Sequence, residues 1–166
     1  MADSYLRPLR PTDMDALVRM TSATGVFRPD EVEIARGVLT DALARGAASD
    51  YMAWVAVDGD RPVGYVAFGP TPLTVGTWDV HWIAVEPGRQ RQRTGARLMA
   101  AVEEEACRRQ ARQVLAEMSG GTLYEQARRF FLRLGYTEIS RIPDFYDVGE
   151  PRVTYAKTLD CGKTAR

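Results

Sequence analysis

Three β-rich runs in close succession constrain this chain more than any other feature. The runs YMAWVAV (51–57) and PVGYVAFG (62–69) flank an Asp-Gly pair, Asp58-Gly59, which is typical of a tight hairpin turn. A third run, TWDVHWIAVEP (77–87), is aromatic and β-branched and ends at Pro87. Antiparallel strands are therefore expected over the middle of the chain. With 166 residues, 45% of them hydrophobic, the chain can bury one sizeable core.

Helical patterns lie on both sides of these runs. A weak alternation at 5–9 is followed by TDMD (12–15), which we expect to cap a helix that stops before Gly25. The segment PDEVEIARGVLTDALAR (29–45) begins with proline and acidic residues and is followed by Gly46, which predicts a second helix. A third helix should follow the stretch RQRQRTGARL (89–98), and its apolar face comprises Leu98, Met99, Val102 and Ala106.

The rest of the chain alternates between the two kinds of element. We expect a strand at 113–118, a helix at 122–134, a strand at 135–140, a Pro/Gly loop at 142–151 and a final strand at 152–159. This order predicts an α/β (α+β mixed) fold, in which about four helices flank a mixed, mostly antiparallel sheet of about seven strands. We expect one domain over 1–160 and a frayed tail at 161–166.

Composition excludes several classes of protein. Lys+Arg and Asp+Glu both number 22, so no global field attracts the chain to nucleic acid or to an anionic membrane. No apolar run has the length of a signal peptide or of a membrane-spanning helix, and we expect a cytoplasmic protein. The two cysteines, Cys107 and Cys161, give no metal-ligand spacing and no disulfide framework; Cys107 is expected to pack as a small apolar residue, and no metal is expected.

The arginine-rich stretch is unusual in a chain of zero net charge. A strand that passes through a short loop into a helix directs the unpaired N–H groups of the helix at whatever lies beyond the strand end, where phosphate is favoured. Gly95 would allow close approach of the backbone, and Arg89, Arg91 and Arg93 could bind phosphate oxygens. The glycine patterns of Rossmann and P-loop sites are absent. The alternative is that these arginines only solvate the start of a helix.

The neighbouring residues favour phosphate binding. The order V-x-P-x-x-Q-x-x-x-x-G-x-x-L, residues 85–98, resembles the pyrophosphate-binding motif of the GNAT superfamily of acyl-CoA-dependent N-acetyltransferases. FFLRLGY (130–136), GTWDVHWIAV (76–85) and PDFYDVGEPRVTYAKTL (143–159) are also similar to segments of that superfamily, so the resemblance covers roughly 50–160. It implies a sheet that splays between strands 78–86 and 113–118, and possible homodimers.

The resemblance also implies where acetyl-CoA binds as cosubstrate. Backbone N–H groups near Ile83 and Val85 would hold the pantetheine arm, and Tyr124 would lie beside the cofactor. The pyrophosphate would lie on a loop formed by Gln90, Arg91, Gln92, Arg93, Thr94, Gly95 and Ala96. The first glycine of the family motif is replaced by Arg93. We expect a loop that keeps Arg93 at negative φ, so that its guanidinium adds a phosphate ligand; a positive φ would cost about 1 kcal/mol or more.

Candidate catalytic residues lie on the strand before that loop. Simple alternation places Asp79, His81, Ile83 and Val85 on one face. The residues six and four positions before Val85 can carry the base in GNAT enzymes, and here they are Asp79 and His81. We expect Asp79 to bind the substrate ammonium and His81 to relay its proton, because imidazole titrates near neutral pH. The alternative is that these two polar groups only satisfy one another or a neighbouring strand.

The proton donor is missing from its usual place. GNAT enzymes commonly carry a tyrosine four residues after the alanine of the last helix, and counting from Ala127 this position is Phe131. Tyr124 or Tyr146 could replace it, or the thiolate could leave unaided. The predicted function is direct acetyl transfer from acetyl-CoA to a primary amine of a small molecule or peptide. The alternative is a non-catalytic acyl-CoA-binding domain, and nucleic-acid binding is disfavoured because Glu103-Glu104-Glu105 separate the basic clusters.

Overall fold

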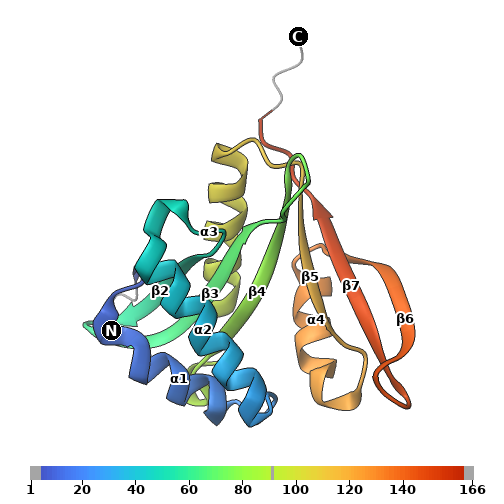
Figure 1. Ribbon diagram of the computed structural model, residues 1–166, viewed down its shortest axis with the longest axis horizontal. Coiled ribbons are helices and arrows are strands. Elements are labelled where there is room, and N and C mark those ends of the chain that lie inside the picture. Colours follow the sequence, from blue (N-terminus) through green and yellow to red (C-terminus); the bar gives the residue numbers. More distant parts are fainter. Residues whose placement is uncertain (1–4, 91, 163–166) are drawn as a thin grey trace.

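A seven-stranded sheet with helices on both faces forms the protein, in a computed structural model that describes residues 5–90 and 92–162 (Figure 1). The strand order across the sheet is β1-β2-β3-β4-β5-β7-β6. The strands are β1 Tyr5–Pro8, β2 Met52–Asp58, β3 Arg61–Pro70, β4 Thr77–Val85, β5 Gln113–Ser119, β6 Thr137–Asp147 and β7 Glu150–Thr158. Gly59, at φ 61°, lies in the two-residue turn between β2 and β3, as the Asp-Gly signal predicted.

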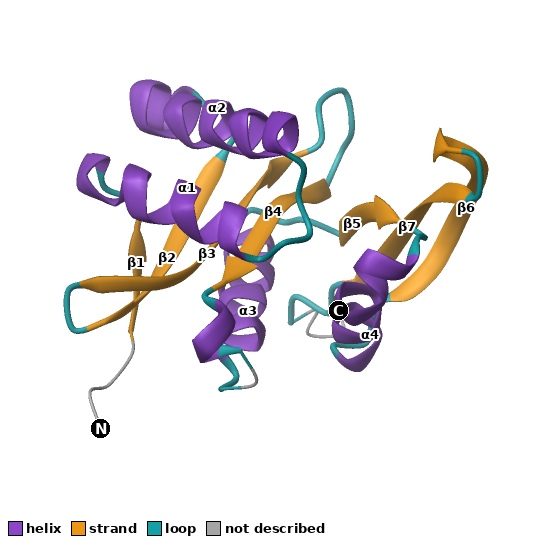
Figure 2. Cartoon of the chain, turned by 90° about the horizontal axis from the view of Figure 1, so that it is seen from below, coloured by secondary structure: helices purple, strands orange, loops and turns teal. Residues whose placement is uncertain are grey.

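Four α-helices cover the sheet, two on each face (Figure 2). α1 (Met14–Ala23) and α2 (Pro29–Arg45) pack on one face, where Leu17 and Leu39 are fully buried against β2 and β3. α3 (Thr94–Arg108) and α4 (Glu125–Arg133) lie on the other face, and the predicted apolar face of α3 is buried there. The predicted mixed, mostly antiparallel fold is confirmed.

One pair of neighbouring strands breaks the antiparallel pattern. β4 and β5 run parallel, and they pair only from Thr77–Gln113 to Val80–Ala116. Beyond Val80, β4 still pairs with β3 as far as Val85, while β5 continues alongside β7. The two halves of the sheet therefore separate at the carboxyl ends of β4 and β5, and this opening is visible between them in both views (Figures 1 and 2).

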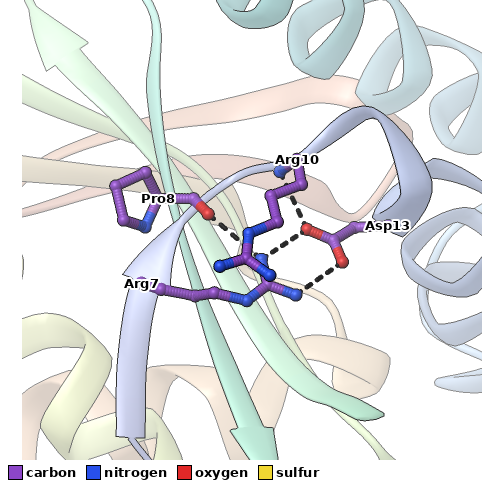
Figure 3. Close-up of polar contacts among 4 residues, drawn as sticks. All are labelled: Arg7, Pro8, Arg10 and Asp13. Carbon is purple, nitrogen blue, oxygen red and sulfur yellow. Dashed lines mark hydrogen bonds and ion pairs between the residues drawn. The ribbon is translucent and has the colours of Figure 1, made fainter. Parts of the chain in front are cut away.

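A buried ion pair ties β1 to the start of α1 (Figure 3). Arg7 donates two hydrogen bonds to the Asp13 carboxylate, at 2.7 and 2.8 Å, and the Arg10 backbone N–H donates a third at 2.8 Å. Burial by itself would raise the pKa of Asp13, but the bonds from Arg7 and Arg10 outweigh it and hold that pKa below its usual value. Asp13 is the N-cap residue of α1, within the predicted 12–15, but its carboxylate caps the preceding 3-10 turn (Pro11–Asp13) by accepting from the Arg10 N–H and makes no capping bond to α1.

The C-terminal region differs from the expectation in two ways. β6 extends to Asp147 through much of the predicted loop, because an edge strand tolerates Pro143 and a register shift between Ile142 and Asp147. Cys107 forms a disulfide with Cys161, at an S–S distance of 2.11 Å. The expectation of a merely packed Cys107 was wrong, because Cys161, 54 positions further along the chain, lies against α3; residues 163–166 of the expected frayed tail lie outside the described residues.

Candidate active site

A pocket of about 550 Å³ occupies the opening between β4 and β5. Ile83 and Val85 line it and pack with the core cluster under α3 and α4, whereas Trp82 and Ala84 line it and pack with the cluster under α1 and α2. The pocket is therefore accessible to groups from both faces of the sheet. Two substrates could enter from opposite sides and meet where the strands separate.

A β-bulge at His81 changes which β4 side chains share a face. Ala67 of β3 pairs with Trp82, and the next residue, Phe68, pairs with Val80, so His81 is the extra residue. Trp78 and Val80 consequently share the α3 side with Ile83 and Val85. The prediction that Asp79 and His81 lie on the face of Ile83 and Val85 was wrong, since alternation fails at the bulge. His81 instead packs edge-on against the Tyr51 ring, at 4.9 Å between centroids.

The N-terminus of α3 forms one end of the pocket. The first α-helical hydrogen bond runs from the Arg97 N–H to the Arg93 carbonyl, so the N–H groups of Thr94, Gly95 and Ala96 have no acceptor within the helix. These three residues line the pocket together with Gln90 and Arg93. Such a turn favours a phosphate group, through its free donors and through the helix dipole. The sequence-predicted loop thus lies where a phosphate of a bound cosubstrate could reach it.

This loop contacts both the end of β4 and the face of α4. Gln90 donates to the Val85 carbonyl at 3.4 Å and accepts from Gln126 of α4 at 3.3 Å. A Cβ on Gly95 would lie 3.1 Å from the Phe130 ring, so the missing side chain allows α3 and α4 to approach closely. The loop is therefore held between the end of β4 and the face of α4.

The arginines of the loop have different surroundings. Arg93 adopts φ 64°, in the left-handed region, so the expected negative φ was wrong. Its side chain is exposed, and no ion pair is found for it among the described residues. Arg89 pairs with Asp58 at 2.5 Å. Gln92 is exposed and does not line the pocket, while Arg91 lies outside the described residues.

His81 lines the pocket and its Nε2 atom is buried without a hydrogen-bond partner among the described residues. Burial lowers the pKa of the His81 imidazole, although the nearby negative charge of Asp79 raises it in part. His81 is therefore neutral at pH 7 and can accept a proton. Asp79 is not among the lining residues; its carboxylate accepts a hydrogen bond from Thr71 at 2.6 Å.

Tyr124 and Tyr146 have different positions relative to the pocket. Tyr124 lines it, directly before α4, and burial with the negative charge of Glu31 raises the pKa of its hydroxyl to about 12. Tyr146, on β6, is 40% exposed and does not line the pocket; its hydroxyl donates to Glu117 at 3.5 Å. Phe131 is 2% exposed and packs edge-on against Tyr136.

Sequence reasoning missed Glu117. It lies on β5 directly after Ala116, the last residue that pairs with β4, and it is the one carboxylate among the described residues that line the pocket. Arg152 lies 3.4 Å from it. Its position in a short strand run gave no signal, because only the splay of the sheet exposes this side chain to the opening.

Two general features of the described residues complete the site. Within 5–90 and 92–162, no group of three or more His, Cys, Asp and Glu side chains could hold a metal ion. No helix in the same ranges is long and apolar enough to cross a membrane.

The fold and the pocket together point to an acyltransferase domain, in which an opening through the sheet lies beside a helix N-terminus. The model of the acetyltransferase (GNAT) domain matches residues 49–138. The crystal structure of a GNAT-family protein from Desulfovibrio desulfuricans has a TM-score of 0.91 and 34% sequence identity, covering 94% of this chain and 99% of that one. The chain belongs to the GNAT acetyltransferase family.

More distant structures share the fold alone. An aminoglycoside 6'-N-acetyltransferase complexed with coenzyme A has a TM-score of 0.73 at 19% identity, covering 93% of this chain and 96% of that one. The structure of yncA from Salmonella typhimurium with acetyl-CoA has a TM-score of 0.73 at 17% identity, covering 98% and 96%. No curated protein matches the sequence.

Proposed function

We propose that this acetyltransferase moves an acetyl group from acetyl-CoA directly to a primary amine of a small molecule or peptide. The observation that carries the proposal is the pocket between β4 and β5, which joins the free amides of α3 on one side of the sheet to His81 and Trp82 on the other. If the pyrophosphate binds the N–H groups of residues 94–96, the pantetheine arm can extend along β4.

The backbone of β4 supports this placement. Residues 82–85 pair with β3 but have no partner on β5. Their peptide groups on that side can hydrogen-bond an extended arm that carries amides, in the way that a peptide adds to a free strand edge. Ile83 and Val85 supply the apolar contact beside it.

The chemistry needs one base and one route for a second proton. The amine nitrogen attacks the thioester carbonyl, the C–N bond forms, and the C–S bond breaks to release CoA. A neutral His81 accepts the proton that the acceptor ammonium must lose before attack. Asp79, whose charge favours protonation of His81, would stabilise the resulting imidazolium.

The remaining amine proton passes to the leaving sulfur. A thiol of pKa about 8.5 is a stronger acid than the Tyr124 hydroxyl, whose pKa is about 12. Tyr124 would therefore not remain deprotonated. It would donate its hydroxyl proton to the departing sulfur and accept the remaining amine proton, so that the hydroxyl is restored. The Tyr146 hydroxyl bonds to Glu117 and does not line the pocket, so it could reach the leaving sulfur only from the rim of the pocket.

A non-catalytic acyl-CoA-binding domain is the second candidate, and it is favoured by one observation. Phe131 fills the position of the usual tyrosine and has no proton to donate. Such a domain would bind acetyl-CoA and release no CoA with any amine.

Melting temperatures with acetyl-CoA, CoA and free ATP test the proposal. A ligand at about one hundred times its dissociation constant should stabilise the fold by about 2.7 kcal/mol, or roughly 5–10 °C. Both CoA species should raise the melting temperature and ATP should not. His81→Ala should keep the shift and turn over more slowly; no shift with either CoA species would refute the proposed binding site.

A further inference from the structure

Three aromatic rings lie next to one another along the pocket. Phe27, in the connection between α1 and α2, lies 6.1 Å from the Trp82 ring and 6.3 Å from the Tyr124 ring, measured between centroids. All three rings line the pocket, and they come from three separate elements. We call these three residues the aromatic wall.

The rings of the aromatic wall reach both faces of the sheet, because Tyr124 packs with the core cluster under α3 and α4 and Trp82 does not. Trp82 packs with the core cluster under α1 and α2, whereas the free amides of Thr94–Ala96 belong to α3 on the opposite face. The neighbours of the wall in the pocket are small or apolar, namely Ala23, Thr24 and Val26. This end therefore suits an apolar body rather than a hydroxyl-rich or polycationic one.

Glu117 is the only carboxylate among the described residues that line the pocket. Glu117 is 47% exposed and lies on β5, opposite the stretch of β4 that carries His81 and Trp82. The Tyr146 hydroxyl and Arg152 hold its carboxylate from the β6/β7 side. An ammonium at Glu117 would be within the same opening as the neutral imidazole that must take its proton.

We propose that the acceptor is a primary amine carried by an aromatic or bulky apolar group. Its ring packs against the aromatic wall, and its ammonium is bound by Glu117 before the proton passes to His81. This inference rests on the proposed function, and it adds the substrate class and the residues that select it. The amine can belong to a free arylalkylamine or to a peptide whose first residue is aromatic, since the recognised group is the same.

Acetyl transfer to four probes tests the inference: 2-phenylethylamine, the dipeptide Phe-Gly, ethanolamine and spermidine. Burying one phenyl ring should raise kcat/KM for 2-phenylethylamine about 10- to 100-fold over ethanolamine. A higher value for 2-phenylethylamine than for Phe-Gly would identify a free amine as the acceptor, and the reverse would identify a peptide N-terminus. Equal or greater kcat/KM for ethanolamine or spermidine would overturn the inference.

Variants tie the preference to the wall. Phe27→Ala should lower kcat/KM for 2-phenylethylamine more than for ethanolamine and so remove most of the preference, because the ring contact is lost. Phe27→Leu, which keeps apolar volume, should retain an intermediate preference. Tyr5→Ala is the matched control, since Tyr5 is 45% exposed on β1 and lies outside the pocket. An unchanged preference in folded Phe27→Ala would overturn the inference.

Calorimetry separates this inference from the proposed function. 2-Phenylethylamine is titrated into CoA-saturated protein, with ethanolamine as the matched probe. Binding of the aromatic amine alone, without turnover, would support the aromatic wall and refute the proposed catalysis. If both amines bind equally, or if neither binds, the proposed binding of the acceptor by the aromatic wall is refuted, even if acetyl-CoA raises the melting temperature.

Discussion

Val80 of β4 and Ala116 of β5 are the last residues that pair between the two parallel strands. One residue further, His81 bulges out of the β3 pairing and Glu117 faces the opening. The sheet therefore separates at the same point where His81, the proposed base, and Glu117, the proposed ligand of the ammonium, are located. Variants at this point should change catalysis more than stability.

The pH dependence of turnover should report His81. At saturating amine, kcat should fall as pH drops below about 6.5, and the midpoint should lie below the ordinary pKa of histidine because burial lowers it. His81→Ala should lose this acidic limb. Asp79→Asn should move the limb to lower pH, since Asp79 is the group that raises the pKa of His81. An unchanged limb in His81→Ala would exclude His81 as the base.

Arg93→Gly should stabilise the protein. Arg93 adopts φ 64°, where a side chain costs about 1 kcal/mol and glycine does not. Urea denaturation should show a gain of up to about 1 kcal/mol, and Gln92→Gly, which removes no positive φ, is the control. Weaker acetyl-CoA binding by Arg93→Gly would show that the guanidinium binds a phosphate of the cosubstrate. Unchanged binding would show that the Arg93 side chain does not contribute to binding.

Removing the Asp13 carboxylate should be costly. Asp13→Asn leaves the buried Arg7 guanidinium without its anionic partner, and we expect a loss of about 3–5 kcal/mol in the free energy of unfolding. Because the folded pKa of Asp13 lies below its unfolded value, the pair stabilises the fold above about pH 4 and this contribution declines as pH falls through the folded pKa. The exposed pair of Asp30 with Arg28 supplies the control, since Asp30→Asn should change stability far less than Asp13→Asn.

Reduction of the disulfide should destabilise the protein. Cys107 and Cys161 are 54 residues apart, and a cross-link of this span contributes about 2–4 kcal/mol. Urea denaturation with and without a reducing agent measures the difference. The Cys107→Ser/Cys161→Ser double variant should resemble the reduced protein and should not respond to reductant; equal stability of the oxidised and reduced protein would contradict the contribution.

Gly95→Ala should disturb the loop through α4. The added Cβ would lie 3.1 Å from the Phe130 ring, so the ring or the helix start must move by a few tenths of an ångström. We expect an acetyl-CoA dissociation constant at least threefold higher, with a small loss of stability. Gly88→Ala, where a Cβ meets open space, is the control in the same loop. Equal affinities of the two variants would contradict a requirement for close packing at Gly95.

The sequence by itself determined the elements and the strand–loop–helix segment at 85–98 for which we propose cosubstrate binding. The Asp-Gly turn, the β-rich runs and the helical periodicities correspond to observed strands and helices, because local backbone preference and amphipathic pattern act over a few residues. The order from Val85 to Leu98 identified the loop because its strand–loop–helix geometry depends on neighbouring residues in the chain.

Only the tertiary structure decided how the site is assembled. A single extra residue at His81 reversed the face of Asp79 and His81, and no alternation rule contains such a bulge. Glu117 and the aromatic wall meet at one opening through strand order and splay, which are long-range properties. The same holds for Cys107 and Cys161, because a contact between residues 54 positions apart depends on the path of all the chain between them.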